Sequence, residues 1–183
     1  MTLNWPTKND YDALTALRNR PGTRKWFLDD REVSVEESRR WLRDMPRPRD
    51  ALLVIRESSS ETFLGSIGWT NWDTSAGTAT FGRLAIERSG LRRLAAKLGA
   101  PVSIAVDAAT ALRDFAFCEM GLVALDTWYA ADNTLAAKVN ASVGMVVTGP
   151  DSLVRPGGQL LPITRATLTR ARWIGHSTSA CRT

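Results

Sequence analysis

Three strand-forming segments follow one another in the middle of the chain, and one long helical segment comes after them. Residues 51–57 (ALLVIRE) and 62–69 (TFLGSIGW) flank a serine-rich turn, as in a hairpin, and residues 78–87 (TATFGRLAIE) form a third strand. Residues 104–120 carry apolar side chains at helical spacing, and Gly121 follows where a helix C-cap belongs. Strands and helices of these lengths predict an α/β fold.

The segments around this middle part complete the order of elements. Ser34 and Glu37 form a capping-box pattern that predicts a helix over residues 35–45, and shorter helices are expected near Asp10 and Asn133. Further strands are expected at residues 2–5, 123–129, 145–148 and 160–168. No linker divides the chain, so we expect one domain over residues 1–170 and a basic, flexible C-terminal tail over residues 171–183.

The composition is that of a globular protein. The chain has 183 residues, 44% hydrophobic and 23% charged, which is enough to bury one core. It has no apolar run of the roughly 20 residues that a membrane-spanning helix needs. Its first residues also lack the layout of a signal peptide. We therefore expect a soluble, cytoplasmic protein with no membrane partner.

Histidine and cysteine are scarce, which limits the available chemistry. The single histidine, His176, lies in a tail rich in Ser and Thr, so the body of the chain cannot supply a Ser-His-Asp triad or a Cys-His pair. Cys118 and Cys181 are far apart and lack the paired spacing of a zinc site. We expect neither a structural disulfide nor a bound metal.

Basic residues give the chain a formal charge of +5 and fall into three groups. Five arginines lie within residues 39–49, and five more follow residue 153, where no acidic residue occurs. The third group is Arg88, Arg92, Arg93 and Lys97. Each group is either a solvated face or part of a site for a polyanion, namely a phosphorylated cofactor or RNA.

Two stretches resemble the GNAT acetyltransferases, especially the branch with ribosomal-protein and amino-sugar N-acetyltransferases. One is residues 18–42, which is similar to the first two helices of that branch. The other is residues 107–145, which is similar to the central helix and the segments that follow it. The matching residues of the second stretch are Phe117, Gly121, Leu122, Asn133, Gly144 and Met145. The resemblance covers about residues 2–170 and implies a GNAT fold, with a mixed sheet of about seven strands, a splayed strand pair and about four helices.

The resemblance also implies where an acyl donor binds. In the family, the acyl group enters the gap between the splayed strands, and main-chain groups of the strand before the central helix hold it. These positions are Leu84, Ala85 and Ile86, with Asn133 as a further donor-binding residue. Backbone N–H groups at this place stabilise the oxyanion of acyl transfer. No tightly bound cofactor is expected, because the donor is a substrate.

The segment expected to bind the diphosphate of coenzyme A departs from the family pattern. It reads LGAPVSIAVDAA, with only Gly99, and Pro101 lacks an N–H donor. Asp107 is either an ordinary helix N-cap or a carboxylate that repels an anion at the helix start. With Arg88, Arg92, Arg93 and Lys97 as polyanion-binding residues, this pattern favours an aminoacyl-tRNA donor, and hence a tRNA partner. The alternatives are an acyl-CoA donor and a non-catalytic binding module.

Several side chains are candidates for acid–base work and for acceptor binding. Asn140 aligns with a family Tyr that protonates the leaving thiolate, and an amide cannot do this. Asp126 and Glu87 are the strand carboxylates that either act as the base or are structural charges. Trp26, Phe27 and Trp69 either line an acceptor pocket or belong to the core. The expected acceptor is a small-molecule amine, and the oligomeric state is left open between monomer and homodimer.

Overall fold

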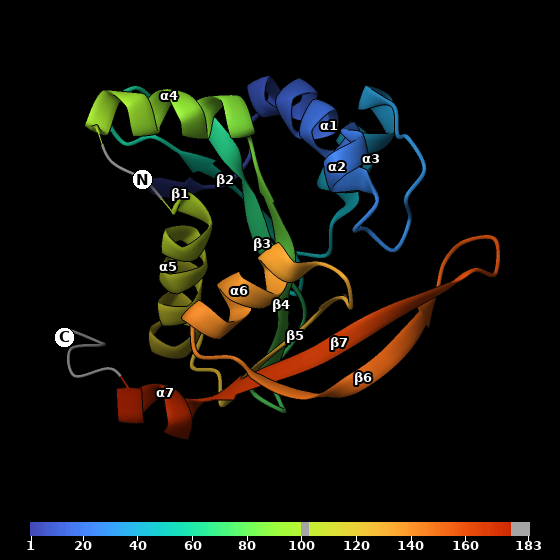
Figure 1. The fold of residues 1–183 in the computed structure, drawn as a ribbon, viewed down its shortest axis with the longest axis vertical. Helices are drawn as coiled ribbons and strands as arrows, with labels where there is room; N and C mark the ends of the chain where they lie inside the picture. The colour runs from blue at the N-terminus through green and yellow to red at the C-terminus, as the bar shows by residue number, and fades with distance from the viewer. Residues whose placement is uncertain (100–102, 177–183) are drawn as a thin grey trace.

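A computed structural model describes residues 1–99 and 103–176. Its seven strands form one sheet in the order β1-β2-β3-β4-β5-β7-β6 (Figure 1). The strands are β1 (Thr2–Asn4), β2 (Ala51–Arg56), β3 (Phe63–Asp73), β4 (Thr78–Ile86), β5 (Ala124–Ala130), β6 (Val146–Val154) and β7 (Leu160–Thr169). Only β4 and β5 are parallel, and every other neighbouring pair is antiparallel. This mixed sheet confirms the predicted fold class.

The helices within the described residues number seven, more than the expected four or so. They are α1 (Tyr11–Asn19), α2 (Pro21–Arg24), α3 (Val35–Asp44), α4 (Arg88–Leu98), α5 (Ile104–Cys118), α6 (Thr134–Ser142) and α7 (Arg170–His176), with a 3-10 turn at Lys8–Asp10 before α1. The predicted capping box is present at α3, where the Glu37 backbone N–H donates to Ser34 Oγ at 3.1 Å. The additional helices are α2, α4 and α7.

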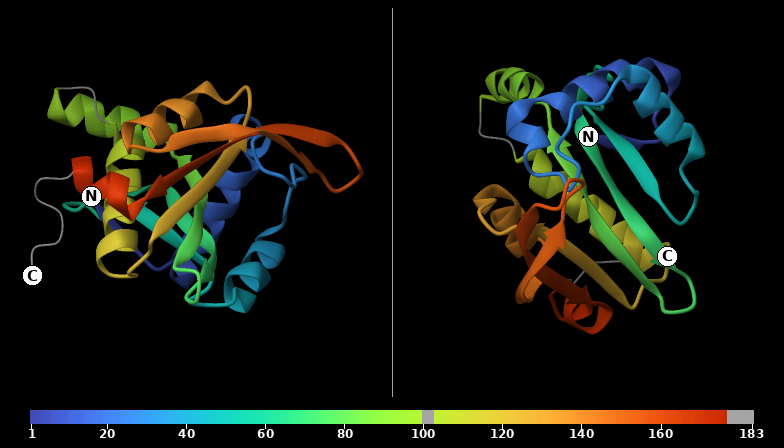
Figure 2. Two further views of the ribbon diagram at one scale, coloured as in Figure 1. Left: turned by 90° about the horizontal axis from the view of Figure 1, so that it is seen from below. Right: turned by 90° about the vertical axis from the view of Figure 1, so that its right-hand side faces the viewer.

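Helices cover both faces of the sheet. The alternation of side chains along a strand directs residues to opposite faces, and β2 shows this clearly. Leu53 and Ile55 join the cluster that includes Leu112 of α5, whereas Leu52 and Val54 pack with α1 and α3. Figure 2 shows α3 and α5 on opposite sides of the sheet. The chain therefore has an α5–α6 face and an α1–α3 face.

The parallel pair of β4 and β5 is short. Its register runs from Thr78 beside Ala124 to Phe81 beside Thr127, and pairing stops there. Beyond this point β4 continues beside β3 to Ile86, and β5 continues beside β7. The two strands thus separate in the middle of the sheet, as the predicted splayed pair requires.

The end of the chain returns to α5. Trp173 of α7 is buried and stacks on Phe117 with ring centroids 5.0 Å apart, and its indole N–H donates to Asp114 at 3.0 Å. Residues 171–176 of the expected flexible tail are therefore held in α7, while residues 177–183 lie outside the described residues. Cys118 is disulfide-bonded, against our expectation. Cys181 lies outside the described residues, and the domain boundary at residue 170 stays a prediction.

Residues 1–99 and 103–176 contain neither a membrane-spanning helix nor a cluster of metal ligands. No helix in these ranges is both long and apolar enough to cross a bilayer. The same part of the chain has no cluster of three or more His, Cys, Asp or Glu side chains that would hold a metal ion.

Candidate active site

A β-bulge in β4 shapes the gap between the separated strands. The register advances from Gly68 to Ser66 on β3 while it advances from Gly82 to Ala85 on β4, so β4 contains one extra residue. The extra residue lies at Arg83, whose φ of 55° is in the left-handed region. Ser66 is buried, and its hydroxyl donates to the Arg83 carbonyl at 3.2 Å. The bulge therefore bends β4 away from β5 at the point where the gap opens.

The narrow end of the gap is closed by a side chain of β5. Thr127 is buried, and its hydroxyl donates to the carbonyl oxygen of Phe81 at 3.0 Å. This bond satisfies the last β4 carbonyl before the strands part, and it lies in the core, where an unpaired carbonyl would be costly. Thr127 thus fixes where the gap begins.

The predicted donor-binding positions lie along this gap. Leu84, Ala85 and Ile86 all follow the last residue of β4 that pairs with β5. Ile86 also lines a cavity of about 170 Å³ at the open end of the gap, together with Arg20, Gly22, Thr23 and Arg88. The structure therefore brings the expected β4 segment to a hollow that α2 and the start of α4 border.

Glu87 also lies at the open end of the gap, where it serves as the N-cap of α4. Its carboxylate accepts hydrogen bonds from the backbone N–H and the hydroxyl of Ser89, at 2.9 and 2.7 Å, and it forms an ion pair with Arg20. The hydrogen bond from Arg20 lowers the pKa of Glu87 to about 2, and the bonds from Ser89 add to this effect. A carboxylate with so low a pKa is a poor proton acceptor. Its environment is that of an N-cap for α4, not of the predicted base.

The two asparagines of the α6 region differ in their surroundings. Asn133 is the N-cap of α6, and its side-chain oxygen accepts from the Ala136 backbone N–H at 3.1 Å. Asn140 is 7% exposed, and its side-chain oxygen is the only buried side-chain N or O atom of the described residues without a hydrogen-bond partner. Its neighbours on α6, Ala136 and Ala137, pack against the cluster that contains Phe81 and Leu125. The Asn140 side-chain oxygen is therefore a buried acceptor that the N–H group of a ligand would satisfy.

The α1–α3 side of the gap carries a second set of predicted residues. Asp126 of β5 is exposed and beside Thr80 of β4, and it makes no hydrogen bond or ion pair with the described residues. Gly82 follows on β4, and a Cβ added there would meet no atom within 4 Å. Trp128 lies on the same face as Asp126, since alternate residues of a strand share a face. An open space therefore lies beside a carboxylate where the strands separate.

The structure separates the three predicted acceptor aromatics. Trp26 packs with Trp128 and the Ala130 region of β5, on the side of the gap where Asp126 lies. Phe27 lies under Arg18, whose guanidinium carbon is 5.0 Å from the ring centroid. Trp69 is 5% exposed in the α5-side core, and its indole N–H donates to the Pro48 carbonyl at 3.0 Å. Trp69 therefore fills the core and does not line the pocket with Trp26, because its position in β3 directs it to the opposite face.

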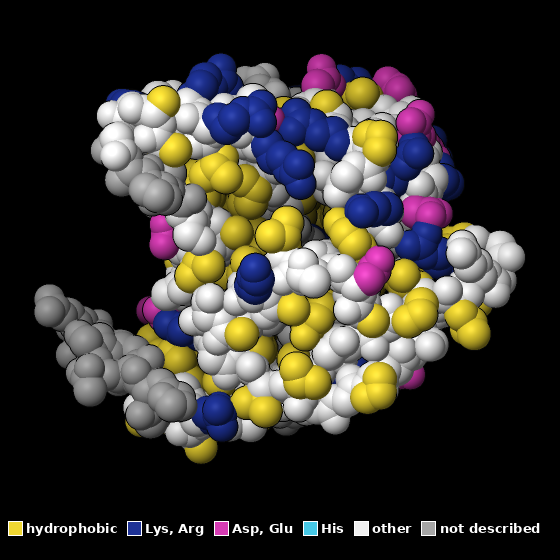
Figure 3. Space-filling model, in the orientation of Figure 1, with side chains coloured by type: hydrophobic (Ala, Val, Ile, Leu, Met, Phe, Trp, Pro, Cys, Tyr) yellow, Lys and Arg dark blue, Asp and Glu magenta, His cyan; other side chains and the backbone are white. Residues whose placement is uncertain are grey.

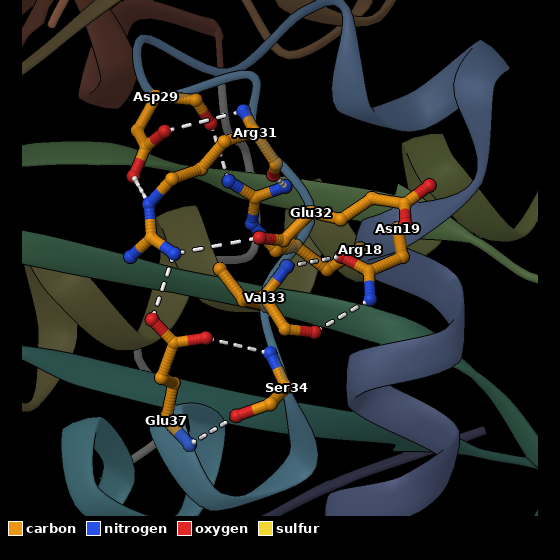
Figure 4. Close-up of polar contacts among 8 residues, drawn as sticks. All are labelled: Arg18, Asn19, Asp29, Arg31, Glu32, Val33, Ser34 and Glu37. Carbon is orange, nitrogen blue, oxygen red and sulfur yellow. Dashed lines mark hydrogen bonds and ion pairs between the residues drawn. The ribbon is translucent and has the colours of Figure 1, made fainter.

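A polar network holds the loop that carries Trp26 and Phe27 (Figure 4). The Asn19 side chain bonds both the N–H and the carbonyl of Val33, at 3.0 and 2.7 Å, and Arg18 donates to the carbonyls of Asp29 and Arg31. Arg155, from the loop between β6 and β7, donates to the Lys25 carbonyl at 2.8 Å. These residues have no distinctive spacing in the sequence, and only the fold reveals them as the supports of this loop.

Comparison with known proteins decides the family of the chain. A family model described as an acetyltransferase (GNAT) domain matches residues 1–146. The chain belongs to the GNAT acetyltransferase family. A search of curated proteins gives no match to this GNAT chain. The match does not distinguish the branch with ribosomal-protein and amino-sugar enzymes, which stays a prediction.

Solved structures share the fold of this GNAT protein. One is spermidine N-acetyltransferase from Vibrio cholerae in complex with CoA and spermine, with a TM-score of 0.79 and 14% identity. The match covers 94% of this chain and 97% of that one. Another is the spermidine/spermine N-acetyltransferase SpeG of the same organism with manganese ions, with a TM-score of 0.72, 14% identity and 96% of both chains covered. At this identity the likeness establishes the fold alone.

The predicted polyanion-binding residues of α4 do not share one cavity, and Arg92 lines neither of the two cavities that the others line. Arg88 lines the cavity at the gap, whereas Arg93 and Lys97 line a separate cavity of about 270 Å³. Lys97 Nζ is 2.7 Å from Glu57, and this hydrogen bond lowers the pKa of Glu57 to about 2. Figure 3 shows Lys and Arg side chains gathered over α4 and α2, above a hollow with hydrophobic walls. Of the four residues, Arg88 is the one placed at the mouth of the gap.

The other two arginine-rich groups are only partly paired with carboxylates of the fold. Arg43 contacts Asp44 at 2.9 Å, and Arg165 contacts Asp151 at 2.6 Å. Other pairs are Arg39 with Asp12 and Glu36, and Arg155 with Asp30. Part of the positive charge that suggested RNA is thus offset by neighbouring carboxylates.

The segment before α5 is only partly described. Gly99 ends α4 with a left-handed φ of 64°, so it serves as a C-cap. Pro101 lies outside the described residues. Asp107 is exposed one turn inside α5, and the N-cap position belongs to Ser103. The reading of Asp107 as an N-cap is therefore wrong, because α5 begins earlier than that reading requires.

Proposed function

We propose that this GNAT protein transfers an acetyl or other acyl group from acyl-CoA to a primary amine of a small molecule. The observation that carries the proposal is the separation of β4 from β5 after Phe81 and Thr127. The separation leaves main-chain groups of residues 84–86 available on the β5 side. Backbone N–H groups held in place before the reaction stabilise the oxyanion that forms when an amine attacks a thioester.

We favour acyl-CoA as the acyl donor over the aminoacyl-tRNA that the sequence pattern favours. No comparison supports a tRNA donor, and a structural neighbour is a spermidine N-acetyltransferase in complex with CoA. The local pairing of Arg43 and Arg165 also weakens the charge argument for a tRNA partner. Acyl-CoA is therefore the proposed donor.

Two side chains are proposed to hold the donor, because the segment before α5 has only one glycine, Gly99, with which to bind the diphosphate. Arg88 forms no ion pair with the described residues and lines the cavity at the gap, so it is placed to bind a phosphate. Asn140 has an unpaired carboxamide oxygen on the α5–α6 face. We propose that this oxygen accepts a hydrogen bond from an amide N–H of the pantetheine arm. Asn133 supports the same region indirectly, by capping α6.

Asp126 is the proposed general base. It is exposed beside the open space above Gly82, whereas Glu87 is capped and strongly acidic. The acceptor amine loses its proton to Asp126, directly or through water, and its nitrogen bonds to the thioester carbon. The carbon–sulfur bond then breaks, and the thiolate takes a proton from solvent. Trp26 and Trp128 form an apolar wall for the acceptor on this side.

Release of free thiol from acetyl-CoA in the presence of a panel of small amines tests the proposal, with mass spectrometry of the product. Transfer to at least one amine is expected. The Asp126→Asn variant should lower kcat/KM at least ~100-fold, the low end of the usual effect of a general base. Asp12→Asn, which changes an exposed aspartate of α1, is the control and should leave the rate unchanged. Binding of acetyl-CoA without any transfer would instead support the non-catalytic module.

A further inference from the structure

Arg83 adopts a conformation that a side chain of its size rarely takes. Its φ of 55° lies in the left-handed region, where residues other than glycine, asparagine and aspartate are uncommon. Such local strain is often found at functional sites. The bulge thus places a large side chain, that of Arg83, at the point where β4 leaves β5. A glycine, asparagine or aspartate would adopt this conformation more easily.

The guanidinium of Arg83 is largely enclosed but poorly paired. It lies over the Trp41 ring, with 4.4 Å from its central carbon to the ring centroid, and its side chain is 24% exposed. Burial lowers its pKa, and the nearby Asp50 only partly offsets this effect. Asp50 approaches no closer than 3.7 Å, and its other carboxylate oxygen accepts from the Asn71 backbone N–H at 3.0 Å. Within the described residues, the five N–H donors of this guanidinium make no hydrogen bond.

Three features lie together on the α1–α3 side of the sheet. Arg83 contacts Trp41 of α3, which covers this face. Gly82, the preceding residue, faces open space where a side chain would otherwise stand. Asp126 projects from β5 to the same face, because its neighbours Leu125 and Thr127 face the α5 side or the gap. The Asp126 carboxylate and the Arg83 guanidinium, which makes no hydrogen bond within the described residues, therefore flank an open space beside the gap.

We infer that the acceptor of this enzyme is a primary amine that also carries an anionic group, a carboxylate or a phosphate monoester. The inference rests on the proposed acetyl transfer. The amine lies at the gap near Asp126, and the anionic group lies on Arg83. A guanidinium held flat on an indole ring presents its N–H groups in the fork that binds two oxygens of a carboxylate or phosphate. A polyamine supplies no anionic group to bind the guanidinium of Arg83.

Matched pairs of amines test this inference. L-Lysine and cadaverine have the same carbon chain and terminal amine and differ by the carboxylate, and O-phosphoethanolamine and ethanolamine differ by the phosphate. Each is titrated calorimetrically into the full chain without an acyl donor and is then assayed for acetyl transfer. At least one amine with an anionic group should bind ~10-fold or more tightly than its counterpart without that group, because a site built for a polar group rejects ligands that lack it.

Variants of Arg83 separate recognition from structure. Arg83→Gln should remove the ~10-fold preference, chiefly by raising KM for the anionic amine. Arg83→Lys should keep part of the preference, and this variant serves if Arg83→Gln does not fold. Arg40→Gln, on the exposed face of α3, is the control and should keep the full preference.

Three outcomes would overturn the inference. One is a plain amine that binds as tightly as its anionic counterpart, and another is an equal loss for both members of a pair in Arg83→Gln. The third is the absence of binding by all four amines. Because the titration contains no donor, its result stands even if acetyl-CoA proves to be the wrong donor, so the two proposals can fail separately.

Discussion

The hydroxyl of Thr127 donates a hydrogen bond of 3.0 Å to the carbonyl oxygen of Phe81, and these two residues are the last pair of β4 and β5. Replacing Thr127 with Val keeps the shape but leaves this buried carbonyl unpaired. We expect the free energy of unfolding to fall by about 1–2 kcal/mol. Urea denaturation measures this change. Thr167→Val is the matched control on β7, where the hydroxyl lies 3.5 Å from the Leu125 carbonyl, and it should cost clearly less. Equal losses in both variants would refute a special role for Thr127.

Glu87 predicts a pH-dependent contribution to stability. Its pKa is lowered from 4.5 to about 2 in the folded protein, mainly by the hydrogen bond from Arg20. The carboxylate therefore stabilises the fold fully above about pH 4.5, and this contribution is lost as the pH falls toward 2. Glu87→Gln should lower the free energy of unfolding by about 1–2 kcal/mol at pH 7, and the difference from the parent should shrink at pH 3.

The same Glu87→Gln variant distinguishes a cap from a base. As a cap, Glu87 affects stability, and kcat should change only a few-fold. Glu36→Gln on the exposed side of α3 is the control for both measurements. A loss in kcat of ~100-fold with unchanged stability would return Glu87 to the role of base.

Asn140 should show opposite effects on stability and on donor binding. Its side-chain oxygen is buried without a partner, so Asn140→Leu removes an unsatisfied group and should leave stability equal or higher. The same change should weaken acetyl-CoA binding about 10-fold, if the carboxamide bonds the donor. Asn19→Leu is the reverse control, because both polar atoms of Asn19 are bonded to Val33. It should destabilise the protein and leave donor binding unchanged. Loss of stability in Asn140→Leu would contradict this account.

Two arginines of α4 offer a matched pair for the donor phosphates. Arg88 lines the cavity at the gap, and Arg93 lines the separate cavity with Lys97. Arg88→Gln should weaken acetyl-CoA binding about 10-fold, through loss of a charge-assisted hydrogen bond. Arg93→Gln should have little effect in the same titration. The reverse order of effects would place the diphosphate on the outer side of α4.

The sequence predicts those parts of the fold that depend on local signals. The capping box of Ser34 and Glu37 correctly marks the start of α3, and the helical spacing before Gly121 correctly predicts α5. The splayed strands follow from the family resemblance. The predicted β3 ends at residue 69, but the strand continues to Asp73, because pairing with β4 stabilises residues of low strand preference.

The features that define the site depend on contacts between distant residues, which have no local signature. Nothing in the sequence marks Arg83 as left-handed, since a bulge is visible only in the register of two strands. The ion pair of Arg20 with Glu87 joins the N-cap residues of α2 and α4, and it lowers the pKa of the candidate base. Trp69 resembles a pocket residue by type, but its place in β3 buries it in the core.

Calorimetric titration of the full chain with acetyl-CoA tests the central claim most directly, with aminoacyl-tRNA titrated under the same conditions for comparison. We predict saturable binding of acetyl-CoA with a dissociation constant on the order of micromolar, the common range for enzyme substrates, and none for the tRNA. Absence of acetyl-CoA binding at millimolar concentration, with tight and salt-sensitive binding of the charged tRNA, would contradict the account.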